Sequence, residues 1–67
     1  MRISYNKLWK MLIDKNMNKS DLKDRAGISS ASIAKLGKGD NITTDVLIKI
    51  CEAMSCRLED ILETVDD

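Results

Sequence analysis

Two short helical segments joined through a single glycine constrain this chain more than any other feature of its sequence. Asn18 opens the first segment and Ser29 opens the second, and both side chains can accept a hydrogen bond from a free amide of a first helical turn. Gly27 lies between the segments and can adopt the positive φ that ends a helix. The sequence therefore predicts one helix from 18 to about 26 and another from 30 to about 36.

Apolar residues elsewhere in the chain recur at helical spacing rather than in strand-like alternation. A first helix is expected from about 4 to 15, with Ser4 as its N-cap, and a fourth helix is expected to begin at Thr43 or Thr44 and end near Met54. The apolar spacing from Leu58 to Val65 predicts a short fifth helix, and the glycine-rich segment 37–41 predicts a loop. The expected fold class is all-α, with five short helices.

The length of 67 residues leaves room for one domain with one small core, so a single domain is expected over residues 1–67. No stretch approaches the roughly 20 apolar residues needed to cross a membrane, and the N-terminus lacks the apolar segment of a signal peptide. A cytoplasmic protein is expected. The two cysteines, without any His, predict no metal site, because structural zinc needs four ligands. Cys51 is instead expected to be a small buried apolar residue, and Cys56 a similar one nearer the surface.

The net charge of zero conceals an uneven distribution along the chain. Residues 1–38 carry nine basic and three acidic side chains, a net charge of +6, whereas residues 39–67 carry two basic and eight acidic side chains, a net charge of −6. Such asymmetry is typical of a protein with a nucleic-acid surface on one side. It indicates an oriented charge dipole and only modest affinity for random DNA, because the acidic side repels phosphate.

The pattern Leu22-x-x-x-Ala26-Gly27-Ile28-Ser29-x-x-x-Ile33-x-x-Leu36 is narrower than that of a generic pair of packed helices. A short turn containing glycine between two helices is the signature of the helix-turn-helix motif. In that motif the second helix enters the major groove of DNA while the first crosses the backbone. The pattern therefore predicts binding to double-stranded DNA.

These residues resemble the Cro and phage-repressor (XRE) family of helix-turn-helix regulators over nearly the whole chain, from Tyr5 to Val65. The segment Ala26-Gly27-Ile28-Ser29 is similar to the family's Ala-Gly-Val-Ser turn, and the resemblance extends to residues 44–56 and 58–62. It implies a lambda-repressor-like domain with the motif in helices two and three. It also implies a compact, single-domain transcriptional repressor or regulator, associated with the bacterial nucleoid.

One residue departs from the family pattern, which usually has a small residue directly after the leucine of helix two. This chain has Lys23 there, whose aliphatic stem can pack while its amine points outward. Lys23 is therefore expected where helices two and three cross.

The expected DNA contacts fall into two groups. The resemblance places the base-reading positions on the exposed face of helix three, where Lys can donate to guanine, Ser can donate or accept, and an Ala methyl can contact thymine. These positions are Ser30, Ala31, Ala34 and Lys35. Phosphate contacts are expected from helix N-termini and neighbouring polar or basic side chains. This second group consists of Asn18, Lys19, Ser20, Lys38, Asn41, Thr43 and Thr44.

One helix-turn-helix contacts one half-site, so a homodimer is expected if spare apolar side chains form an interface rather than completing the core of a monomer. These side chains are Met1, Ile3, Met54, Ile61 and Val65. No sensor domain is recognisable, so no small-molecule effector or cofactor is implied. An enzyme is not expected, because there is no His for acid–base chemistry and no oxyanion site beside Ser32 and Lys35.

Two alternatives remain open at this stage. A DNA-binding antitoxin or controller protein of a two-gene cassette would use the same surface. A helical protein-interaction module that does not bind DNA would show partner binding that persists in high salt, whereas DNA binding falls steeply with salt.

Overall fold

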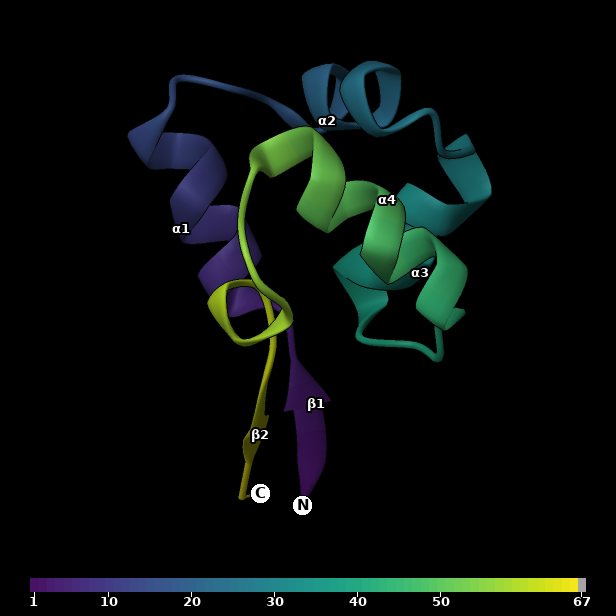
Figure 1. Ribbon diagram of the computed structural model, residues 1–67. Helices are drawn as coiled ribbons and strands as arrows, with labels where there is room; N and C mark the ends of the chain where they lie inside the picture. The colour runs from purple at the N-terminus through teal and green to yellow at the C-terminus, as the bar shows by residue number, and fades with distance from the viewer. Residues whose placement is uncertain (67) are drawn as a thin grey trace.

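The computed structural model describes residues 1–66 and arranges four α-helices and a two-stranded sheet around one core (Figure 1). The elements are β1 (Arg2–Ser4), α1 (Asn6–Asp14), α2 (Lys19–Ala26), α3 (Ser30–Lys38), α4 (Thr44–Met54), a 3₁₀-helix (Leu58–Asp60) and β2 (Glu63–Val65). The expected helical class is confirmed, with four rather than five α-helices in the part of the chain described. None of these helices is long and apolar enough to cross a membrane.

The predicted N-caps of α2, α3 and α4 are confirmed. The Asn18 Oδ1 accepts from the Asp21 amide at 2.8 Å, and the Asp21 carboxylate accepts from the Asn18 amide at 3.0 Å, which forms a complete capping box. The Ser29 and Thr43 hydroxyl oxygens accept from amides three residues later, at 3.1 and 3.3 Å. Three helix starts are therefore fixed by side chains within a few residues of each start.

Glycines in the left-handed conformation end both helices of the motif, Gly27 with φ +67° and Gly39 with φ +72°. The expected loop at 37–41 is wrong in its first half, because α3 continues through Gly37 to Lys38. The Asp40 amide donates to the Lys35 carbonyl at 2.9 Å, which completes a left-handed C-terminal turn around Gly39. Of Gly37 and Gly39, only Gly39 therefore ends α3.

The first helix is shorter than expected, since it begins at Asn6 and ends at Asp14. Ser4 is not its N-cap but the buried last residue of β1, and its hydroxyl oxygen accepts from the Asn6 amide at 3.3 Å. Ile13 is apolar but 73% exposed, whereas Met11 packs against the core. The inward face is therefore centred on Leu8 and Leu12.

The predicted fifth helix is wrong. Residues 58–60 form a single 3₁₀ turn, and Glu63–Val65 forms β2, which pairs antiparallel with β1 so that Arg2 lies opposite Val65. A segment this short gains little from helical hydrogen bonds, whereas a neighbouring strand satisfies its backbone groups directly. The Lys7 ammonium holds the segment in place by donating to the Glu59 carbonyl at 3.1 Å and lying 3.9 Å from the Glu63 carboxylate.

The core draws residues from every helix and from the C-terminal segment. Its fully buried side chains are Leu8, Leu22, Leu36, Ile50 and Ile61. Leu47 of α4 is also buried, and Ile33 of α3 is half-buried against this cluster. Burial of Ile61 and Met54 removes both from the set of residues available for a dimer interface.

Candidate nucleic-acid interface

The turn between α2 and α3 is short and is anchored to the core by a buried side chain. Gly27 takes the left-handed conformation, and the next residue, Ile28, is buried with 8% of its surface exposed. The Ile28 amide donates to the Lys23 carbonyl at 3.2 Å, which returns the chain toward the last turn of α2. This hydrogen bond and the buried side chain fix the direction in which α3 leaves α2.

Helix α3 has one buried and one exposed face. Leu36 is buried, Ile33 is half-buried, and Ser32 is half-buried with its hydroxyl 3.1 Å from that of Ser29. The four residues predicted to read bases are all exposed on the other side: Ser30, Ala31, Ala34 and Lys35. The structure therefore presents them to solvent together, on one continuous helical surface.

The residues predicted to contact phosphate lie at three helix ends that flank this surface: the start of α2, the end of α3 and the start of α4. All seven are exposed: Asn18, Lys19, Ser20, Lys38, Asn41, Thr43 and Thr44. The capping box already occupies the amides of Asn18 and Asp21 and adds a carboxylate to this helix end. The amides of Lys19 and Ser20 remain the donors that the start of α2 can offer to an anion.

Lys19 has a structural contact that the sequence did not reveal. Its Nζ lies 4.7 Å from the centre of the Trp9 ring, in the geometry of a cation–π interaction. A methyl group built on Gly37 would come within 3.4 Å of the same Nζ. The Lys19 side chain therefore links α1, α2 and the last turn of α3, in addition to the phosphate role expected for it.

Lys23 adopts the arrangement expected for a lysine at this position, with its stem packed and its amine directed outward. Its side chain is half-buried, and its Nζ donates to the Ser30 hydroxyl oxygen at 3.4 Å, across the junction of α2 and α3. A lysine is thus accommodated where the family has a small residue, because the stem covers the junction while the ammonium reaches its rim.

The charges of the motif are not neutralised by neighbouring carboxylates. Three ion pairs of the described residues, Lys7 with Glu63, Lys49 with Asp45 and Arg57 with Glu59, all lie outside α2 and α3. The lysines of α2 and α3 therefore keep their charge available for a polyanion.

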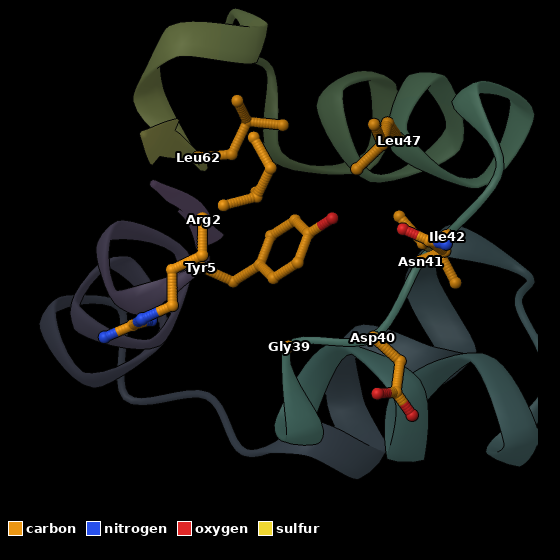
Figure 2. Close-up of a pocket in the computed structure, with 9 residues that line it drawn as sticks. Arg2, Tyr5, Gly39, Asp40, Asn41, Ile42, Leu47 and Leu62 are labelled. Atoms are coloured by element: carbon orange, nitrogen blue, oxygen red, sulfur yellow. The ribbon is translucent and has the colours of Figure 1, made fainter. Parts of the chain in front are cut away.

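A separate cavity of about 460 Å³ lies between the start of α1 and the loop before α4 (Figure 2). The Tyr5 hydroxyl points toward its centre, whereas the Arg2 guanidinium and the Asp40 carboxylate point outward. Burial raises the pKa of the Tyr5 hydroxyl. The polar groups do not converge, and residues 1–66 contain no cluster of three side chains suited to a metal ion.

Comparison with known proteins agrees with this geometry. Residues 7–67 match the family described as the Cro/C1-type HTH DNA-binding domain. An uncharacterised HTH-type transcriptional regulator of Bacillus subtilis (strain 168), YozG, is 41% identical over 59 residues, which cover 85% of this chain and 70% of that protein. The crystal structure of the transcriptional regulator VanUg (Form II) superposes with a TM-score of 0.92 at 47% identity, covering 98% of this chain and 88% of that one. The chain belongs to the Cro/C1-type helix-turn-helix family of DNA-binding domains.

Proposed function

We propose that this protein is a bacterial transcriptional repressor or regulator that binds a specific site on double-stranded DNA by inserting α3 into the major groove. It acts in the cytoplasm, on DNA of the nucleoid. The proposal is supported by membership of a family of DNA-binding domains. It is also supported by the similarity to YozG and VanUg, which are both described as transcriptional regulators. The proposal requires neither a cofactor nor a small-molecule effector.

The outward face of α3 is the observation that carries the proposal. Its four exposed residues are small or flexible, so the helix backbone can approach the base edges closely. In this proposal Lys35 donates to guanine, Ser30 bonds to a base edge, and the methyl groups of Ala31 and Ala34 contact thymine. Leu36 holds the opposite face in the core, so the helix cannot rotate this surface away from DNA.

The flanking helix ends orient α3 in the groove in the same proposal. The α2 terminus, with Lys19 and Ser20, contacts the backbone on one side of the groove. Lys38 and the threonines before α4 contact it on the other side, where the Thr43 hydroxyl can still donate although its oxygen caps α4. These contacts position the protein without reading sequence.

Selection of bound duplexes from a random DNA pool tests this function, followed by measurement of affinity at several salt concentrations. We expect one sequence to be enriched, and the logarithm of its affinity to fall with the logarithm of salt by about 0.9 for each phosphate contacted. Absence of enrichment together with salt-independent partner binding would instead indicate a protein-interaction module.

We further propose that the protein binds its site as a homodimer. The sheet formed by β1 and β2 leaves Ile3 39% exposed and Val65 half-buried, next to the exposed Met1. They are the members of the expected interface set that are not buried in the core, unlike Met54 and Ile61.

Sedimentation with and without the selected DNA tests this assembly. A monomer at high concentration in both cases would contradict it, and Ile3→Asp should shift a dimer toward monomer.

A further inference from the structure

The junction of α2 and α3 carries an inference that rests on the proposed DNA binding and goes one step beyond it. A cavity of about 200 Å³ opens there, lined by Lys19, Ser20, Lys23, Ser30 and Ile33. Of these five residues, two are lysines and two are serines, and none carries a carboxylate. A cavity of this composition favours ligand atoms that accept hydrogen bonds.

Lys23 and Ser30 meet within this cavity and bring together a helix expected to track the DNA backbone and one expected to read bases. The Lys23 Nζ donates to the Ser30 Oγ at 3.4 Å. Because an ammonium group has only donors, the Ser30 oxygen must be the acceptor in this contact. The hydroxyl proton of Ser30 is then directed elsewhere, and the exposed side of the residue faces solvent.

We propose that Lys23 is a specificity-determining residue that acts through Ser30. By donating to one of the two lone pairs of the hydroxyl oxygen, Lys23 reduces the acceptor capacity of Ser30 and favours its role as a donor. The junction is then rich in donors toward the major groove, since the Ser30 proton and two further protons of the ammonium are available against one remaining lone pair of Ser30. Guanine offers two acceptors at its major-groove edge, N7 and O6, whereas the cytosine edge offers the N4 donor. The pair therefore selects guanine over cytosine at the base read by the start of α3.

The experiment compares the base preferences of four proteins by selection from the same random DNA pool. These are the wild type, Lys23→Met, Ser30→Ala and the double variant. Methionine keeps the length and the apolar stem of lysine but has no donor. Lys23→Met and Ser30→Ala are each expected to reduce the preference for guanine at the same base pair by about tenfold. The double variant should show no larger loss than either single variant, because both act on one contact.

Two controls separate this effect from general ones. Lys15→Met removes an exposed lysine just after α1 and should leave every base preference unchanged. Lys23→Arg restores a donor and should retain the preference for guanine. If Lys23→Met does not fold, as judged by thermal unfolding, Lys23→Gln replaces it, and its amide N–H can donate only as a neutral and weaker group.

A uniform loss of affinity in Lys23→Met, with a salt slope smaller by about one and unchanged base preferences, would overturn the proposal and make Lys23 a phosphate contact. Unchanged affinity and preference would overturn it as well. Failure of the wild type to select any sequence would instead reject the proposed function. A wild type that selects a sequence which Lys23→Met still prefers equally well rejects only the role of Lys23.

Discussion

The helix-turn-helix unit and the sheet that pairs β1 with β2 are stabilised by different kinds of interaction. In the segment from α2 to Gly39, the caps and turns are hydrogen bonds between residues three to five positions apart. The other region joins β1 to β2, and the Lys7 ammonium to the Glu59 carbonyl 52 positions away. The helix-turn-helix unit is therefore specified by local interactions, whereas the pairing of β1 with β2 depends on contacts that form only when the chain has folded.

The largest expected effect concerns Ile61, the buried residue that anchors the C-terminal segment to the core. Ile61 is fully buried, so Ile61→Ala should lower the free energy of unfolding by about 2–5 kcal/mol. Leu58, which is 46% exposed in the same segment, serves as the matched control, and Leu58→Ala should cost about 0.5 kcal/mol or less. Urea unfolding measures both. Equal effects would show that the C-terminal segment is not anchored through Ile61.

Cys56 reports on the same region through its reactivity. Burial, and after it the neighbouring Cys51, raise the pKa of the Cys56 thiol from 9.0 to about 11. Because only the thiolate is alkylated, iodoacetamide should modify Cys56 roughly 100-fold more slowly at pH 8.5 in the folded protein than in urea. The residue modified is identified by peptide mapping. Equal rates in the two states would contradict the burial of this thiol.

The same shift has a consequence for stability in alkaline solution. The folded protein holds the Cys56 proton more tightly than the unfolded chain does, so this contribution is fully present below pH 9. It should be lost progressively as the pH rises from 9 toward 11. Cys56→Ala should flatten the alkaline limb of a plot of unfolding free energy against pH.

A smaller effect tests the local unit. Gly27 has φ +67°, so Gly27→Ala should destabilise the protein by about 1 kcal/mol, although no neighbour obstructs the added methyl group. Gly37 lies inside α3 with ordinary helical geometry, so Gly37→Ala should stabilise by about 0.5 kcal/mol once the flexible Lys19 ammonium adjusts. Thermal unfolding distinguishes the two signs. Two changes of the same sign would contradict the left-handed conformation of Gly27 at the end of α2.

The smallest expected effect is that of the ion pair between Lys7 and Glu63. Both side chains are more than 40% exposed, and the charged atoms lie 3.9 Å apart. A double-mutant cycle with Lys7→Met and Glu63→Gln should yield a coupling energy of about 0.5 kcal/mol that declines with salt. A coupling above about 2 kcal/mol would mean that this contact contributes as much as a buried side chain.

The difference between the two regions also explains how much the sequence could predict. Asn18, Gly27 and Ser29 mark helix ends by their own chemistry, so the motif could be located from residues close together in the chain. The short strands could not, because each has three residues and its partner lies at the opposite end of the sequence. The spacing from Leu58 to Val65 fits a helix, but it also fits a turn with Ile61 directed inward.

The candidate site also combines features that the sequence predicted with contacts that it could not predict. Helical periodicity predicted that Ser30, Ala31, Ala34 and Lys35 would share one face, and the structure exposes all of them. Their roles in reading bases remain predictions. The contact of Lys23 with Ser30 and the position of Lys19 over Trp9 depend on side-chain conformations set by tertiary packing. Spacing along the sequence carries no signal for such contacts.

The most direct test of the central claim, that α3 reads DNA through its exposed face, is the affinity for the selected site and for random DNA, measured across salt for wild type, Lys35→Ala and Lys19→Ala. We expect Lys35→Ala to reduce specific binding by about 1–3 kcal/mol with little effect on random DNA. Lys19→Ala should weaken both equally and reduce the salt slope by about one. Unchanged DNA binding in both variants, or an equal loss on both DNAs in Lys35→Ala, would contradict the assignment of α3 as the base-reading helix.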